Sequence, residues 1–296
     1  MFPLPIQYDE PLFRPPSEAR SLILQVTLGC SWNRCAFCEM YTSKQFRIRK
    51  EEDIYSDIDS FQQYAGNVRR VFLADGDPLI LSTVKLLNII SKIKSTFPKL
   101  NRISCYASPG NLNRKSFAEL KELKDAGLNL LYVGIESGDD KVLSNINKGE
   151  TFKSTVTGLN LSKEAGLSSS VMIINGLGGI ERSKEHAINS ARVLNETQAK
   201  YASTLVLSMY KGLEAYKNRL KGSYTPLTVE ELLLELQLLI DKCELKETIF
   251  RTDHASNYLV LKGVLSRDKQ KFMEQIAFAI KNPGMANLRE EYMRGL

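Results

Sequence analysis

The sequence predicts an α/β fold, a partial and open barrel of six parallel strand–helix units followed by a C-terminal helical extension. Short apolar runs rich in Val, Ile and Leu alternate with longer amphipathic segments along residues 21–210. These runs have the length and β-branched content of buried parallel strands. A closed barrel of this kind needs eight such units, so six predict a barrel that is open on one side.

The repeat of strand and helix can be followed unit by unit. The expected strands span 21–29, 68–76, 102–109, 130–137, 168–176 and 203–210. Apolar residues at helical spacing predict helices over 51–64, 82–97, 114–126, 151–165 and 183–196. Gly127 and Gly166 follow two of these helices as expected C-caps, and Ser183 is expected to cap the last one at its start.

Three parts of the chain follow from this pattern. Residues 1–20 form a Pro-rich N-terminal arm, residues 21–216 form the core barrel, and residues 217–296 form the extension. The extension contains expected helices over 228–243 and 268–281 and a short strand over 247–252. We expect this extension to cover the open side or the lower edge of the barrel.

Composition excludes several classes of protein. Apolar residues make up 43% and charged residues 25%, which is ordinary for a globular domain. No apolar run approaches the ~20 residues of a membrane helix, and the N-terminus does not resemble a signal peptide, so we expect a cytoplasmic protein without a membrane partner. The net charge of +6 comes from scattered Lys and Arg; the densest stretch is Lys44, Arg47, Arg49 and Lys50, which could also serve an anionic cofactor.

Three of the five cysteines crowd into one short segment, at Cys30, Cys35 and Cys38, directly after the first expected strand. In a chain without an export signal this pattern favours metal binding over disulfides. Three thiolates do not complete a four-ligand shell. Either a small molecule occupies the open position, as in catalytic centres, or a fourth protein ligand comes from elsewhere. The candidates for such a ligand are Cys105, Cys243, His186 and His254.

A three-cysteine loop after the first strand of a six-unit barrel, with Phe37 just before the last cysteine, resembles the radical SAM superfamily. The family spaces its cysteines by three residues and then by two, whereas this chain has four and then two. The extra residue predicts a bulge at Trp32 or Asn33.

The resemblance implies that the three cysteines hold a 4Fe-4S cluster and that S-adenosylmethionine chelates the fourth iron through its amine and carboxylate. One-electron reduction would cleave S-adenosylmethionine to a 5′-deoxyadenosyl radical, which abstracts hydrogen from the substrate. The protein would then be an oxidoreductase or a transferase that orients this chemistry and excludes water from it.

Other strand ends also resemble the family. The turn over 75–78 resembles the site of the methionine amino group, and the stretches over 133–138 and 146–151 resemble those of oxygen-independent coproporphyrinogen oxidases and tRNA methylthiotransferases. The strand over 172–179 resembles the one that packs on adenine. The resemblance thus implies cofactor contacts by Phe37, Gly76, Asp77, Glu136, Ser137, Asn175 and Met209, although Met209 suits core packing equally well.

The segment over 251–257 places Asp, His, Ser and Asn together after the last expected strand. If that strand docks beside the sixth one, His254 and Asn257 face the barrel mouth. The segment resembles one in a little-characterised radical SAM group. We therefore take His254 and Asn257 as candidate catalytic residues that contact the substrate or order the cofactor.

The substrate does not follow from the sequence. One candidate, by subgroup likeness, is a porphyrinogen-type small molecule that undergoes oxidative decarboxylation, and another is RNA or a peptide, which the basic balance favours slightly. An electron donor such as flavodoxin or ferredoxin is implied. Cys105 and Cys243 are too few for a second cluster, and we expect Cys105 to be a plain buried thiol. The rival interpretation is a non-catalytic protein with structural zinc or a regulatory iron–sulfur centre.

Overall fold

A computed structural model describes residues 5–295, so the first four residues of the predicted arm lie outside the described residues. The chain forms two compact units. The first unit contains the chain up to Asn33, Cys38–Val133 and Asn160–Ser169. The second contains Arg34–Phe37, Gly134–Leu159 and the chain from Ser170 onward.

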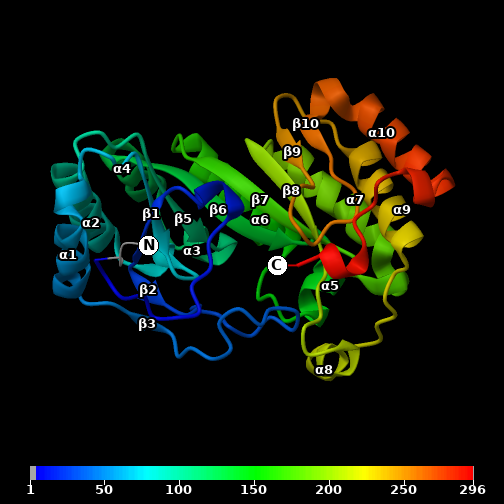
Figure 1. Ribbon diagram of the computed structural model, residues 1–296, viewed down its shortest axis with the longest axis horizontal. Coiled ribbons are helices and arrows are strands. Elements are labelled where there is room, and N and C mark those ends of the chain that lie inside the picture. The colour runs from blue at the N-terminus through cyan, green and yellow to red at the C-terminus, as the bar shows by residue number, and fades with distance from the viewer. Residues whose placement is uncertain (1–4, 296) are drawn as a thin grey trace. The chain divides into compact units, whose positions relative to one another are not determined.

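The first unit contains a parallel sheet in the order β1-β4-β5-β6, whose apolar strands are buried, as a sheet covered by helices requires (Figure 1). A separate antiparallel pair joins β2 to β3. The strand bounds are β1 (Leu22–Gln25), β2 (Thr27–Leu28), β3 (Arg47–Ile48), β4 (Arg70–Ala74), β5 (Arg102–Ala107) and β6 (Leu128–Glu136), the last of which ends in the second unit.

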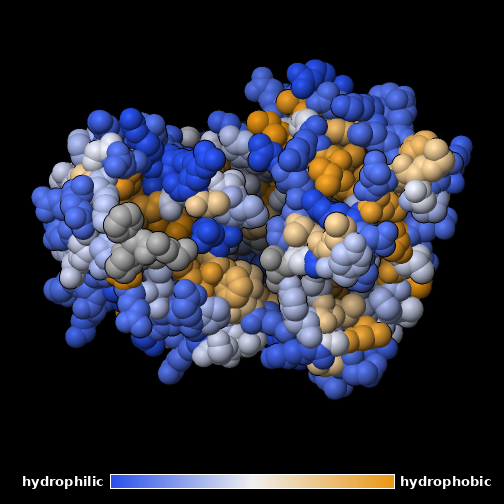
Figure 2. Space-filling view, in the orientation of Figure 1, coloured by the Kyte–Doolittle hydropathy of each residue, from blue (hydrophilic) through white to orange (hydrophobic). Residues whose placement is uncertain are grey.

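Helices pack against this sheet and against one another. The buried Ile54 and Ile58 form the inner side of α1, while its outer side is mainly hydrophilic in Figure 2. Helix α4 begins with a capping box formed by Ser116 and Glu119. The helix bounds are α1 (Glu51–Ser60), α2 (Thr83–Thr96), α3 (Pro109–Asn113) and α4 (Phe117–Ala126), with short 3-10 turns at Pro16–Glu18, Gln62–Tyr64 and Pro78–Ile80.

The second unit continues the same alternation. Strands β7 (Ser168–Asn175), β8 (Tyr201–Val206) and β9 (Ile249–Arg251) are parallel, and β10 (Lys262–Val264) pairs antiparallel to β9. In Figure 1, α7, α9 and α10 lie around these strands, with α9 packed against both α7 and α10. The helix bounds are α5 (Asp140–Asn145), α6 (Phe152–Glu164), α7 (Gly179–Thr197), α8 (Leu213–Arg219), α9 (Val229–Lys242) and α10 (Leu265–Lys281), with 3-10 turns at Pro283–Met285 and Glu291–Met293.

A strand lies within or beside each of the six expected segments, and β9 pairs with β8 as the sequence suggested. Element α7 contains two helical segments joined by a kink at Arg182, whose φ is −139°. The longer segment begins at Ser183, where the helix was expected. The short segment before the kink, which starts at Gly179, was not expected. The three-part division of the chain stays a prediction.

No helix among residues 5–295 is long and apolar enough to cross a membrane.

Candidate metal centre and cofactor site

The segment Cys30–Cys38, called here the cysteine loop, follows β2 and is preceded by Gly29, whose φ is 73°. Its three cysteines are half-buried and form no disulfide. Cys30 and Cys38 belong to the first unit and Cys35 to the second. Among residues 5–295 no group of three His, Cys, Asp or Glu side chains is close enough to hold a metal ion.

The backbone at the end of β4 is joined to the chain that leads into the cysteine loop. The Asp75 amide donates to the Thr27 carbonyl at 3.1 Å, and the Gly76 amide donates to the Gly29 carbonyl at 3.1 Å. The Gly29 amide in turn donates to a carboxylate oxygen of Asp75 at 3.1 Å. The position of Cys30 is therefore tied to the turn after β4.

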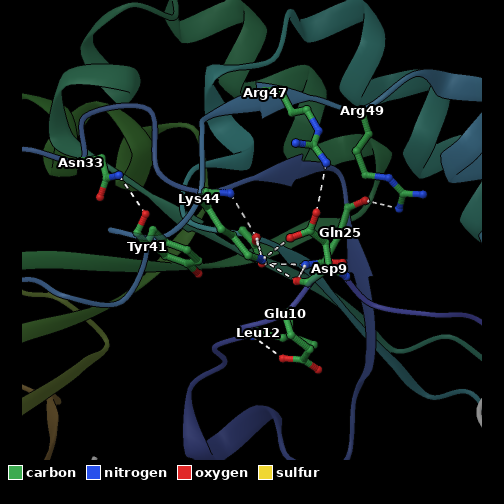
Figure 3. Close-up of polar contacts among 11 residues, drawn as sticks. Asp9, Glu10, Leu12, Gln25, Asn33, Tyr41, Lys44, Arg47 and Arg49 are labelled. Carbon is green, nitrogen blue, oxygen red and sulfur yellow. Dashed lines mark hydrogen bonds and ion pairs between the residues drawn. The ribbon is translucent and has the colours of Figure 1, made fainter.

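Asp75 is fully buried and carries a buried ion pair with Lys44, at 2.8 Å between Nζ and Oδ2. Gln25 donates to its other oxygen at 3.1 Å. Lys44 and Gln25 both donate to the carbonyl of Asp9, and Arg47 pairs with the Asp9 carboxylate (Figure 3). A buried charge is stable only when it is paired and hydrogen-bonded in this way. The buried Lys44 thus stabilises the turn after β4.

Gly76 occupies a place where no side chain fits. A Cβ there would lie 2.9 Å from Cε2 of Tyr41, 3.0 Å from Cβ of Cys30 and 3.1 Å from its Cα. Contacts under 3.0 Å require something to move. The glycine that the sequence singled out therefore permits the turn to pack directly on the first cysteine.

Asp77 is buried, and one oxygen of its carboxylate accepts hydrogen bonds from Ser31 and Asn111. Ser31 lies in the cysteine loop, and Asn111 lies on α3, whose N-cap is Ser108. Sequence reasoning missed Asn111, although a Ser-Pro pair after a strand signals a helix start. The carboxylate at position 77 is thus fixed relative to the cysteine loop by two side chains.

In the second unit, β6 ends at Glu136, a non-glycine residue with φ of 61°. Its carboxylate pairs with Lys148 at 2.8 Å. A Cβ on Gly134 would lie 2.1 Å from the Glu136 carboxylate, so the glycine two residues earlier makes this conformation possible. The sequence pointed to the stretch over 146–151 but did not single out Lys148.

Ser137 is fully buried, and its hydroxyl lies 2.8 Å from Nδ1 of His186. It also accepts the amide of Asp139 at 3.0 Å. His186 is itself fully buried, with Nε2 3.7 Å from Oε1 of Glu235. The Ser137 hydroxyl is therefore engaged inside the protein by groups of α5 and α7.

The turn after β7 is held by the C-terminal part of the chain. The Asn175 side chain donates to the Leu232 carbonyl at 3.0 Å. The Gly176 amide donates to Glu235 at 2.6 Å, and the Gly176 carbonyl accepts from the Tyr224 hydroxyl at 3.0 Å. Asn175 thus positions the turn through α9.

The middle of the cysteine loop packs on a small apolar core in the second unit. The Ala36 amide donates to the Ile146 carbonyl at 2.8 Å, and Arg219 of α8 donates to the Cys35 carbonyl at 2.7 Å. Phe37 and Met209 both pack against the same core as Ala36. Met209 therefore contributes to core packing, one of the two roles that the sequence left open.

The model of one family matches the chain over residues 24–191, described as the radical SAM superfamily. This span is more than half of the 296 residues. The chain belongs to the radical SAM superfamily. Members of this family bind a 4Fe-4S cluster and S-adenosylmethionine, so the resemblance seen in the cysteine loop is confirmed.

Individual radical SAM relatives are distant. The heme chaperone HemW of Bacillus subtilis (strain 168) is 28% identical over 142 residues, which cover 47% of this chain and 38% of that protein. HemW of Buchnera aphidicola is 22% identical over 233 residues, 76% of this chain and 60% of that protein. This chain therefore spans less than two thirds of the length of these relatives.

Solved structures support the same fold. Coproporphyrinogen III oxidase (HemN) from Escherichia coli, a radical SAM enzyme, matches with a TM-score of 0.59 at 18% identity, over 75% of this chain and 52% of that chain. Methylornithine synthase matches with a TM-score of 0.52 at 17% identity, over 76% of this chain and 63% of that chain. The partial barrel predicted from the sequence is confirmed.

The cysteines outside the loop are poor ligands for a radical SAM cluster. Cys105 on β5 is fully buried, and burial raises the pKa of its thiol above the usual range. Burial likewise raises the pKa of Cys243 to about 12. A thiol must lose its proton to bind metal, so burial makes Cys105 and Cys243 poor donors. Cys105 is the plain buried thiol that was expected.

The candidate catalytic residues lie at the edge of β8. Asn257 is buried and donates to the Thr204 carbonyl at 2.8 Å. His254 is half-buried, with Nδ1 2.9 Å from the Ser256 hydroxyl. Burial lowers the pKa of His254, and Arg289 lowers it further, so the imidazole is neutral near pH 7. Its ring is held in one orientation by Ser256.

Proposed function

We propose that the protein is a radical SAM enzyme in which Cys30, Cys35 and Cys38 bind three irons of a 4Fe-4S cluster. The fourth iron would be left for the amine and carboxylate of S-adenosylmethionine. The observation that carries this proposal is the three-cysteine loop itself, whose first cysteine is packed against the side-chain-free surface of Gly76. Three soft thiolate donors suit an iron–sulfur cluster, and the family match supports the same group.

The residues around the cluster divide into binding and positioning groups. Gly76 and Asp77 are proposed to receive the methionine moiety, with the carboxylate held by Ser31 and Asn111 in reach of an ammonium group. Glu136 is proposed to accept from a ribose hydroxyl. The buried hydroxyl of Ser137 is proposed to stabilise the end of β6 through its hydrogen bond with His186.

When bound, the reduced cluster and S-adenosylmethionine supply a 5′-deoxyadenosyl radical that takes hydrogen from the substrate. The protein orients that chemistry and keeps water away from it. Asn175 is proposed to position the turn after β7 against the adenine of the cofactor, through its hydrogen bond to α9. Phe37 and Met209 are proposed to line the apolar edge of the cofactor site from the core they share.

We propose a small-molecule substrate in preference to RNA or a peptide. Three members of the densest basic stretch are engaged in ion pairs, Lys44 with Asp75, Arg47 with Asp9 and Arg49 with Asp57. Such pairing weakens the stretch as a binding surface for phosphates. The reductant is proposed to be a small electron carrier of the flavodoxin or ferredoxin type.

His254 is proposed to contact the substrate, with Asn257 holding it in place. The neutral imidazole is anchored at Nδ1, which leaves Nε2 for a ligand. A His254→Ala variant should lose turnover while keeping the cluster content of the native protein. Native turnover in this variant would remove His254 from the site.

The deciding experiment is anaerobic reconstitution with iron and sulfide, followed by dithionite reduction in the presence of S-adenosylmethionine. We expect 4Fe-4S absorption and formation of 5′-deoxyadenosine, both lost in Cys35→Ala. The matched control is Cys243→Ala, which removes a thiol outside the loop and should retain both signals. Zinc uptake with neither signal would instead support the structural-metal alternative.

A further inference from the structure

Tyr41 lies three residues after the last cysteine of the loop. The sequence pattern predicted no role for it. Its side chain is only 4% exposed. Among residues 5–295 its hydroxyl has no hydrogen-bond partner. A buried hydroxyl that is left unsatisfied is energetically costly, so such a group calls for an explanation.

The ring of Tyr41 is held firmly in place. Phe13 packs edge-on against it, with ring centroids 5.4 Å apart. The Asn33 side chain donates to the Tyr41 carbonyl at 2.9 Å, which fixes the backbone (Figure 3). On its other side the ring touches Gly76, and the same glycine contacts Cys30. Tyr41 and Cys30 thus share one small neighbour, with no side chain of residue 76 between them.

The electrostatic surroundings of the hydroxyl keep it protonated. Burial raises the pKa of Tyr41 far above its ordinary value, and the nearby Tyr106 and Asp75 raise it further. The edge of the ring that carries the hydroxyl faces Gly76, against which Cys30 also packs. The hydroxyl is therefore a donor with a proton to give.

The other buried polar groups nearby are already engaged. Lys44 pairs with Asp75, and its ammonium lies 6.0 Å from the centroid of the Tyr41 ring. Asp75 also accepts from Gln25 and from the Gly29 amide. The neighbour of Gly76 that gains negative charge when iron binds is the sulfur of Cys30.

We propose that the Tyr41 hydroxyl donates a hydrogen bond to the thiolate sulfur of Cys30 and thereby raises the reduction potential of the bound cluster. This inference rests on the proposed function. A hydrogen bond to a ligand sulfur stabilises the more negative, reduced cluster, and such bonds are among the factors that set iron–sulfur potentials. Tyr41 is on this view a positioning and tuning residue that leaves the hydrogen-abstraction step to other groups.

The test compares native protein, Tyr41→Phe and the control Tyr55→Phe, all reconstituted anaerobically. Tyr55 lies on α1, and its hydroxyl donates to Glu51. The Tyr55→Phe variant therefore removes a tyrosine hydroxyl whose hydrogen bond does not involve the cysteine loop. Potentials are measured by EPR-monitored redox titration without substrate. We expect Tyr41→Phe to keep the native iron content but to disfavour reduction about tenfold, a shift of about 59 mV to more negative potential for one electron. Tyr55→Phe should match the native potential.

A second measurement does not depend on the variant. Resonance Raman spectra of the native cluster, recorded in water and in deuterated water, should show deuterium-sensitive iron–thiolate stretching frequencies. An unchanged potential in a fully loaded Tyr41→Phe protein would overturn the inference. So would deuterium-insensitive frequencies in native protein, should Tyr41→Phe fail to load. If native protein itself forms no 4Fe-4S cluster, the proposed function fails, which is a distinguishable result.

Discussion

The two units hold their functional strand ends by different means. In the first unit the turn after β4 depends on a buried charge, since Asp75 has Lys44 as its counter-ion. In the second unit the turn after β7 is held mainly through its backbone, by Tyr224 and Glu235 of the C-terminal part. The first arrangement is strong but fails when one partner is lost. The second arrangement is spread over several bonds from distant residues.

The largest effect is expected where the charge is buried. Replacing Lys44 with Met leaves Asp75 buried without a counter-ion, which should lower the free energy of unfolding by about 3–5 kcal/mol. Denaturant titration measures this loss. The control is Arg47→Met, which removes an ion pair with Asp9 at an exposed side chain and should cost about 0–1 kcal/mol. Equal losses in both variants would contradict the distinction drawn here.

A smaller effect is expected at the turn after β7. Glu235→Ala leaves the buried Gly176 amide without its acceptor, at a cost of about 1–3 kcal/mol in the free energy of unfolding. Glu235→Gln keeps an acceptor oxygen and should recover most of the loss. Thermal or chemical unfolding of both variants checks this. If the Gln variant is as unstable as the Ala variant, the charge of Glu235 matters more than its hydrogen bond.

Packing at the turn after β4 can be tested apart from charge. Gly76→Ala places a methyl group against Tyr41 and Cys30, and overpacking of this kind costs about 1–3 kcal/mol. Because Cys30 is displaced, iron uptake on reconstitution should fall as well. Gly66→Ala is the matched control, since a Cβ there meets nothing within 4 Å. Normal iron uptake by Gly76→Ala would show that the cysteine loop tolerates the shift.

The smallest expected effect is the contribution of His254 to the pH dependence of stability. Burial lowers the pKa of His254 below its ordinary value of 6.5, so the unfolded chain binds a proton more readily than the folded protein does. Stability should therefore rise with pH through the range below 6.5 and level off above it. Unfolding curves of native protein and His254→Gln measure this difference. A variant with an unchanged pH profile would exclude His254 as the cause.

Sequence reasoning succeeded where the signal is local. An apolar run followed by Gly and three cysteines predicts both β1 and the cysteine loop. Both signals lie within a few consecutive residues, because they consist of an apolar run and a cysteine spacing. The short helices α3, α5 and α8 and the strands β3 and β10 were not foreseen, since a few residues carry too little periodicity. The short first segment of α7, before the kink at Arg182, was not foreseen, whereas the longer segment begins at Ser183 as expected.

Contacts between distant residues could not be read from the sequence. The Ser137 hydroxyl bonds to His186, 49 positions away, which the sequence did not signal, and its expected cofactor contact stays a prediction. Lys44 was seen as part of a basic stretch, yet it is buried against Asp75, 31 positions away. Tyr41 carried no signal beyond its distance from Cys38. Such roles depend on the packing of separate segments, which composition and spacing do not encode.

The hydrogen bonds of Asn175 and Gly176 to the C-terminal part have a consequence for the construction of hybrid proteins from this chain. Tyr224, Leu232 and Glu235 all lie beyond residue 216, the predicted end of the core barrel. A shortened chain ending there, or a hybrid carrying another protein's C-terminal segment, would lack a phenol, a carbonyl and a carboxylate that the turn after β7 requires. The C-terminal segment is therefore not an exchangeable module, and any transplant of the barrel must carry its own helix α9 with it.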